Sequence, residues 1–581
     1  MTRSKLLFAA LLLVASLAVV PAATAGPTVH FAAVGSSAMY QASGVAVFND
    51  LATPIGNAHH YTVKTSTACS GGTPCAYIHE LRGTPGQIPD EAGTLWVVWA
   101  GNDGSGNATD VWAYLQVDTI VGNRAFFANP RPLFELNPDT NNGAVPGVNN
   151  IDKNLFVGTQ ADDTKIPNAV FAAITSNSFT AALSDVRPED ALFEHKRIVA
   201  TLSTSNYNGL GYVYTNNVGI PIKSSFTNTQ ATPVAFALKG KDPISGNKVG
   251  KWKAIQVGAE PIIFIINRTN PNGFGQAGHF TNATHQALLN VFDGDHCNVA
   301  QLDPTALDFP VIANLREPLS GTMTTTEFTT FRIYTSTKKP KTSQEKNVGV
   351  PTVGTPANPL SATGVILDSG KPCAAGGGVR KRGIGTGEIV NTAVFAPVGC
   401  PGTLSLCDSI GYTFFSYGNI SKLAGNANFG YLQEDGVDPL FTSYTDGKLP
   451  ACASPTFCPA LPGTSFPHIR DGSYQSWSIL RAVGDPTASN FTDLQNIVST
   501  VQNEINTKVP DLVPAVPISD GDPGLTVYRS HYTQASYTPD NLIATESGGD
   551  VGGCIFNGPP DDATNHLNKH QGGAIGGSCW P

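Results

Sequence analysis

Short apolar runs, each closed by a turn rich in glycine, serine or asparagine, recur along the chain. Runs of this length between such turns predict β-strands. We predict strands at 28–34, 95–100, 179–183, 232–238, 260–267, 309–315 and 411–415. Apolar residues spaced three and four apart predict helices through 39–45 and within 281–302. Strands that alternate with helices predict an α/β architecture.

The turn at 316–322 is the most informative of these turns. It opens with Arg316 and closes with Ser320, Gly321 and Thr322 at the start of a helix-compatible segment. A guanidinium offers a planar fork of donors, hydroxyls add further donors, and glycine allows close backbone approach. Together with the N–H groups of a helix start, they predict an oxyanion site. The same residues also occur as a surface salt-bridge partner followed by an ordinary turn, and the spacing alone leaves that alternative open.

The first residues have the form of a secretory signal peptide. Arg3 and Lys5 precede an apolar stretch at 6–20, and small residues at 23–25 offer a cleavage site after Ala25. The apolar stretch is short for a membrane anchor, and nothing similar recurs. We therefore expect a periplasmic or secreted protein.

Ten cysteines in an exported chain favour disulfides. Neighbours in sequence give the simplest pairings: Cys69–Cys75, Cys400–Cys407, Cys452–Cys458 and Cys554–Cys579, which leaves Cys297 with Cys373. The sequence does not fix this connectivity. No CxxC-type cluster with histidine is present, so we expect no metal site and no cofactor.

Composition indicates a globular protein with long loops. The chain is 41% hydrophobic and 14% charged, and its 60 glycines and 42 prolines indicate many turns. Its 581 residues exceed what one core usually holds, so two or more lobes are expected. A net charge of −9 argues against nucleic acid as a partner. An anionic ligand remains compatible, because local donors decide such binding.

Taken in order, the turns resemble those of one family, the periplasmic phosphate-binding protein of the high-affinity phosphate ABC importer. That family has the type 2 periplasmic-binding fold. The Gly-Ser-Ser turn at 35–37 matches its first turn, Ser184-Asp185 matches its third, and 316–322 matches its anion loop in spacing. Segments 287–295 and 410–415 are similar to a helix and a late strand of the family.

The resemblance covers roughly half of the mature chain and has clear departures. This chain is far longer than the family's compact core, with an insertion at about 338–380. The second turn, within 101–106, aligns in more than one way, and Ser105 is the best choice. Residues 317–319 read Glu-Pro-Leu where the best-known members have Ser-Asp-Gly. These departures bear on the ligand more than on the fold.

The resemblance implies a two-lobed α/β protein, each lobe a sheet flanked by helices, with long disulfide-stapled loop insertions. The implied domains are a signal peptide at 1–25, the first part of lobe 1 at 26–225, lobe 2 at 226–430 with the insertion at about 338–380, and the return to lobe 1 with a C-terminal extension at 431–581. The implied ligand-binding residues are Ser37, Ala38, Ser105, Asp185, Arg316, Ser320, Gly321 and Thr322.

Within that set, Asp185 would decide which anion binds. A carboxylate beside an anion is repulsive unless the ligand offers it a proton, and phosphate carries a proton at neutral pH whereas sulfate does not. An acceptor left unpaired by the wrong ligand is a strong source of specificity. The alternative is a helix cap, because Ser-Asp ahead of 186–190 also resembles a helix entry.

The resemblance implies a monomeric solute-binding protein that captures phosphate, or a similar small oxyanion, in an interlobe cleft for import or scavenging. Its expected partner is an ABC importer membrane complex. An enzyme such as a phosphatase is not expected, because the sequence shows no GxSxG elbow and no clear metal cluster. The alternative is a secreted structural or adhesive protein that reuses the fold without binding phosphate, which low charge and stapled loops also fit.

Overall fold

A computed structural model describes residues 26–64, 94–101, 107–116, 118–134, 166–192, 236–276, 280–293, 296–316, 320–333, 341–342, 352–353, 365–366, 378–383, 386, 389–390, 408–415, 426–448, 466–505, 511–519, 521–529 and 555–557. The predicted signal peptide and its cleavage site lie outside these ranges. Among the cysteines, Cys297 alone lies within them, so the predicted pairings stay predictions.

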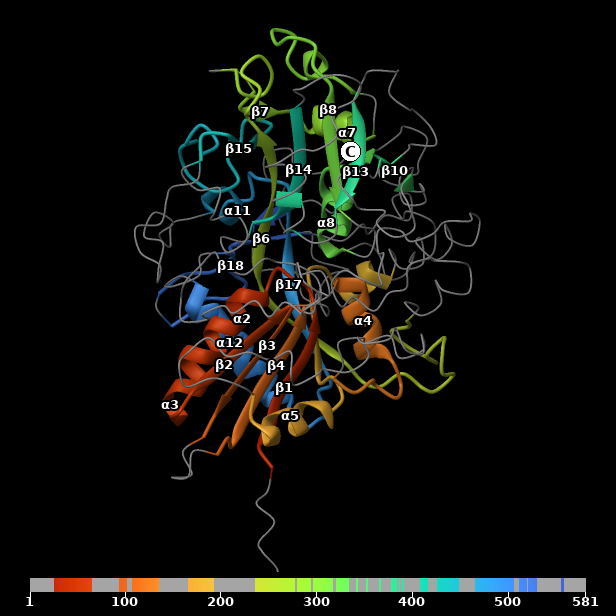
Figure 1. Ribbon diagram of the computed structural model, residues 1–581, viewed down its shortest axis with the longest axis vertical. Coiled ribbons are helices and arrows are strands. Elements are labelled where there is room, and N and C mark those ends of the chain that lie inside the picture. The colour runs from red at the N-terminus through yellow and green to blue at the C-terminus, as the bar shows by residue number, and fades with distance from the viewer. Residues whose placement is uncertain are drawn as a thin grey trace, which may run out of the picture.

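The first lobe is built from the two ends of the described chain. Its strands are β1 (Thr28–Gly35), β2 (His59–Lys64), β3 (Thr94–Ala100), β4 (Asp110–Gln116), β5 (Ala181–Ser184) and β17 (Trp477–Gly484). Its helices are α2 (Tyr40–Ala46), the π-helical η1 (Val47–Ala52), α3 (Thr53–Ile55), α4 (Thr119–Phe127), α5 (Asn168–Thr175) and α12 (Phe491–Ile505). This lobe forms the lower part of Figure 1.

The second lobe comes from the middle of the chain and forms the upper part of Figure 1. Its strands are β8 (Val311–Arg316), β11 (Thr352–Val353), β12 (Val365–Ile366), β13 (Val379–Gly383), β14 (Asp408–Phe414) and β15 (Phe429–Tyr431). Its helical segments are α7 (His285–Asp293), the 3-10 turn η5 (Val299–Gln301), α8 (Gly321–Thr329) and α11 (Pro467–Arg470). Short pairs join β7 (Asn282–Ala283) to β16 (Gln433–Glu434), β9 (Arg332–Ile333) to β10 (Lys341–Thr342), and β19 (Val527–Arg529) to β20 (Ile555–Asn557).

One long strand, β6 (Lys253–Asn267), belongs to both lobes. Its first part, 253–261, pairs with β17, and β18 (Val513–Pro514) pairs with the same stretch. Its second part, 262–266, pairs with β14. The two lobes therefore share one 14-stranded sheet, whose main path runs β11-β12-β13-β8-β14-β6-β17-β5-β1-β4-β3-β2.

Helices cover both faces of the sheet in the first lobe. Alternation along the strands sends Trp96 and Trp112 into the core under α2 and α12, whereas Val97 and Ala113 face the core under α4 and α5. These tryptophans fill the core, because Trp96 is fully buried and Trp112 is 4% exposed. The two-lobed α/β fold predicted from the sequence is confirmed, while the residue boundaries assigned to the lobes stay predictions.

Most predicted elements are present near their predicted positions: strands at β1, β3, β5, β6, β8 and β14, and helices at α2 and α7. The strand predicted at 232–238 is wrong over 236–238, where the chain is irregular. Phe236 is nevertheless buried and stacks on Phe127 with ring centroids 5.6 Å apart. Residues 236–238 therefore pack against the core without forming a strand.

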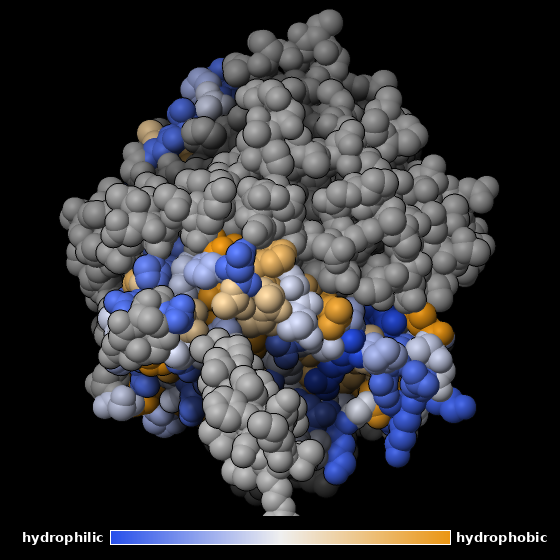
Figure 2. Space-filling model, turned by 60° about the horizontal axis from the view of Figure 1, so that its bottom comes forward, coloured by the Kyte–Doolittle hydropathy of each residue, from blue (hydrophilic) through white to orange (hydrophobic). Residues whose placement is uncertain are grey.

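The described surface at the end of the first lobe is of mixed polarity. Figure 2 brings this end forward, and hydrophobic and hydrophilic residues are interspersed over its described part. Among the described residues, the large hydrophobic side chains that are exposed come from three separate segments, at Leu133, Leu307 and Val516. None of the described helices combines the length and apolar character needed to cross a membrane.

Candidate functional site

Each lobe has a set of parallel strands that end together. In the first lobe, Gly35 at the end of β1 pairs with Gln116 of β4 and with Leu183 of β5. In the second lobe, Arg316 at the end of β8 pairs with Gly383 of β13. Ligands of open α/β sheets bind beyond the carboxyl ends of strands. A ligand site is therefore expected at these two sets of strand ends.

Arg316 is held from several sides at the end of β8. Its side chain is almost fully buried, and Nη1 donates to Thr322 Oγ1 at 3.0 Å and to Thr386 Oγ1 at 3.1 Å. Its backbone N–H donates to the hydroxyl of Tyr412 at 3.1 Å. The Thr413 hydroxyl donates in turn to Thr386 Oγ1 at 2.9 Å. The guanidinium is fixed in orientation, so the alternative of a surface salt-bridge partner is wrong.

Helix α8 starts at the anion loop (residues 316–322) and reaches the first lobe. Ser320 is its N-cap, and its hydroxyl accepts from the N–H of Thr322 at 3.1 Å and of Met323 at 3.4 Å. Met323 packs into the α4-side core of the first lobe. At Gly321, a Cβ atom would lie 2.4 Å from Asp185 Oδ2. Only glycine allows this approach of the two lobes.

Asp185 lies directly after β5, buried at 3% exposure, and is fixed through three of its groups. Ser36 Oγ donates to its carboxylate Oδ1. Its N–H donates to Thr119 Oγ1 at 3.3 Å, and its carbonyl oxygen accepts from Ser478 Oγ at 2.7 Å. A carboxylate held in this way presents a fixed acceptor at the carboxyl edge of the first lobe.

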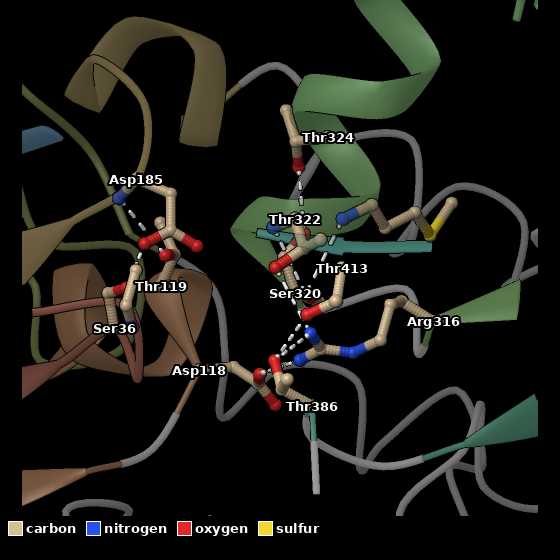
Figure 3. A network of polar contacts seen from close by, with 12 residues as sticks. Ser36, Asp118, Thr119, Asp185, Arg316, Ser320, Thr322, Thr324, Thr386 and Thr413 are labelled. Carbon is tan, nitrogen blue, oxygen red and sulfur yellow. Dashed lines mark hydrogen bonds and ion pairs between the residues drawn. The ribbon is translucent and has the colours of Figure 1, made fainter. Parts of the chain in front are cut away.

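Asp118 and Thr119, at the start of α4, join the two predicted halves of the site. Asp118 Oδ1 lies 3.8 Å from Arg316 Nη2, while Thr119 contacts Asp185 as described. Figure 3 shows the resulting arrangement, with Ser36, Thr119 and Asp185 on one side, and with Asp118 beside Arg316 on the other. Neither residue is among the predicted site residues. An aspartate followed by a helix-compatible segment after the apolar run at 111–115 was the available signal.

The first turn contributes through a residue next to the predicted ones. Ser36, rather than Ser37, bonds to Asp185, and the N–H of Ala38 donates to Ser36 Oγ at 3.0 Å. Ala38 is buried and Ser37 is half-buried. The turn thus lies at the site, and a direct role of Ser37 and Ala38 in ligand binding stays a prediction.

Ser105, the prediction for the second turn, lies outside the described residues. The strand before it, β3, runs antiparallel to β4, with Ala100 opposite Asp110. Asp110 also pairs with Thr28 at the beginning of β1, which is the opposite edge from the carboxyl ends. In the described part of the chain, the turn that follows β4 and contains Asp118 is the one that reaches the site.

The network combines charged groups of both signs with hydroxyls. Its described charged groups are the guanidinium of Arg316 and the carboxylates of Asp118 and Asp185, all buried. Hydroxyls of threonine and serine can donate or accept. The described groups therefore offer a small polar ligand both hydrogen-bond donors and acceptors.

Comparisons with known proteins give likenesses of fold. No protein-family model matches the chain, and no curated protein matches it. An ancestral soluble variant of the Human Phosphate Binding Protein is 13% identical, with 71% of this chain and 85% of that chain covered and a TM-score of 0.32. The Phosphate binding protein from Stenotrophomonas maltophilia is 13% identical, with 66% and 76% covered and a TM-score of 0.29. An ABC-type phosphate transport receptor from Vibrio cholerae is 10% identical, with 48% and 80% covered and a TM-score of 0.23. Likenesses this small assign no ligand to this chain.

Proposed function

We propose that this protein is an extracytoplasmic solute-binding protein that captures a small oxyanion, phosphate in particular, between its two lobes. One observation carries the proposal: a buried arginine from one lobe and a buried aspartate from the other belong to one polar network, in which Gly321 brings the lobes into contact. Arg316 supplies the positive charge, and Ser320, Thr322 and Thr119 supply hydroxyls.

The acidic residue explains why phosphate fits better than sulfate. Asp185 accepts the proton of a hydrogen phosphate, and sulfate has no proton to give at neutral pH. A buried acceptor left without its donor costs about 1–3 kcal/mol, which is roughly a tenfold to hundredfold loss of affinity.

The role that follows is delivery of the bound anion to an ABC importer membrane complex, or scavenging of the anion at the cell surface. The protein acts as a monomer in the periplasm or outside the cell, after removal of the signal peptide at Ala25. Binding requires the two lobes to close on the ligand, which is the hinge closure of periplasmic binding proteins. No catalytic step belongs to this proposal.

Isothermal titration calorimetry of the mature chain against phosphate, sulfate and arsenate tests the proposal. We expect phosphate to bind with a Kd of about 1 μM or tighter, equivalent to about −8 kcal/mol. Arg316→Ala should abolish binding. Lys448→Ala is the matched control, because it also removes one positive charge but from an exposed side chain remote in sequence from the site. An absence of heat with millimolar phosphate would refute the proposal.

A second variant separates phosphate from other anions. Asp185→Asn keeps the shape of the side chain and gives it an amide donor in place of an acceptor. We expect it to weaken phosphate binding and to raise the affinity for sulfate, so that the ratio of the two affinities falls by about tenfold or more. If the ratio of phosphate to sulfate affinity is unchanged, Asp185 does not accept a hydrogen bond from the ligand's proton.

A further inference from the structure

Helix α8 packs on strand β17 through hydroxyl groups. Thr325 of α8 donates to Ser478 of β17, and Thr330, directly after α8, contacts Ser476, directly before β17. All four side chains are at most 1% exposed. A buried hydroxyl is costly unless it is hydrogen-bonded. The packing of α8 on β17 is therefore set by directional bonds, which allow few alternative positions.

One of these hydroxyls connects the two halves of the candidate site. Thr325 Oγ1 donates to Ser478 Oγ at 3.3 Å, and Ser478 Oγ donates to the carbonyl oxygen of Asp185 at 2.7 Å. Thr325 lies on the helix that begins at the anion loop, and Asp185 carries the acceptor of the opposite lobe. We call the chain from Thr325 through Ser478 to the Asp185 carbonyl the hydroxyl strut.

We propose that Ser478 is a specificity-determining positioning residue that holds the Asp185 carboxylate in register with the anion loop. This inference rests on the proposed function. Ser478 contacts no ligand; it acts through the backbone of Asp185. Because the carboxylate must meet the ligand's proton while Arg316 holds the other oxygens, a small shift of the Asp185 backbone removes the discrimination between phosphate and sulfate.

Ser476 provides a matched control two residues away. Its hydroxyl also contacts α8, at Thr330 Oγ1 (2.5 Å), and it donates to Glu434 Oε2 at 2.6 Å instead of to Asp185. It is fully buried, as Ser478 is. Loss of either hydroxyl should therefore disturb the packing of α8 on β17 to a similar extent, whereas only loss of the Ser478 hydroxyl should disturb Asp185.

The test measures phosphate and sulfate affinities by calorimetry, with the thermal midpoint, for the wild type and for Ser478→Ala, Ser476→Ala and Ser478→Thr. We expect Ser478→Ala to lower the phosphate-to-sulfate affinity ratio by about tenfold. Ser476→Ala should lower the midpoint comparably and leave the ratio unchanged. Ser478→Thr, which keeps a hydroxyl, should recover most of the ratio.

Several results would overturn the inference. An unchanged ratio in Ser478→Ala, or an equal fall in Ser476→Ala, would reduce Ser478 to a packing role. Where Ser478→Ala does not fold, Thr325→Val carries the test, because it removes the other end of the hydroxyl strut and should also lower the ratio. A wild-type protein that binds no phosphate refutes the proposed function itself, and the inference falls with it.

Discussion

Replacing Gly321 by alanine adds one methyl group where the two lobes meet. The new Cβ would lie 2.4 Å from Asp185 Oδ2 and 2.4 Å from Thr119 Oγ1, whereas ordinary contacts of such atoms begin at 3.4 Å. Both of these oxygens are on buried, hydrogen-bonded residues of the first lobe. The clash is relieved only if α8 and the Asp185 turn separate by about 1 Å.

The size of the effect follows from two opposing terms. Overpacking a buried contact costs about 1–3 kcal/mol. Alanine is better than glycine by roughly 0.5–1 kcal/mol in a helix interior, so at the first residue of α8 it offsets at most that part of the cost. The net cost of about 1–2 kcal/mol acts against the closed arrangement of the lobes. Since 1.4 kcal/mol corresponds to a factor of ten, we expect phosphate binding about tenfold weaker.

Calorimetry with phosphate and thermal unfolding without it measure this effect. Gly250→Ala is the matched control, because the atom nearest to its added Cβ is 4.0 Å away. That variant should bind phosphate as the wild type does. If Gly321→Ala binds with wild-type affinity and melts at a higher temperature, the close approach of the two lobes at this residue does not exist in solution.

Three further predictions concern other charged residues. Burial raises the pKa of Asp408 from 3.8 to about 6, so the stability that depends on its neutral form is present below about pH 4 and is lost as pH rises through 6. In the wild type, the free energy of unfolding measured with urea should fall by up to about 3 kcal/mol between pH 4 and 8 because of this group, and in Asp408→Asn that fall should be absent. The same pH dependence in the variant and the wild type would contradict this. Asp118→Asn removes a negative charge 3.8 Å from Arg316 Nη2, so calorimetry should show phosphate binding at least about threefold tighter. Weaker binding would contradict the expected repulsion between Asp118 and the anion. Arg470→Lys loses the bidentate pair with Asp522, whose two N–O distances are 2.6 and 2.7 Å. Thermal unfolding should show about 1–2 kcal/mol less stability, and the phosphate Kd should be unchanged. A changed Kd would link this pair to the site.

Arg316 could be placed from a few residues, because it ends an apolar run and precedes a turn of hydroxyl residues at a helix start. Asp185 was reached only through the family resemblance, since Ser-Asp ahead of 186–190 fits a helix cap as well. Ser320 was predicted as a ligand-binding residue, and the structure shows that its hydroxyl caps α8.

Residues that depend on strand direction were out of reach of the sequence. The segments that form β3 and β4 are both apolar. Their residues do not indicate that β3 runs antiparallel to β4 or that β4 runs parallel to β1. That direction decides that the turn with Asp118, and not the end of β3, reaches the site. Thr386 was missed for a similar reason: its partner Arg316 is 70 positions away in sequence, so no local pattern connects them.

The shared strand β6 has a consequence for how the molecule can move and be divided. Because its backbone pairs with β17 over one stretch and with β14 over the next, neither lobe can slide along the other without breaking ladder bonds. Relative motion is confined to bending and twisting about this strand. A cut between residues 261 and 262 would leave each fragment with a sheet edge whose backbone groups have lost their partners. We therefore expect that the two fragments would not fold independently.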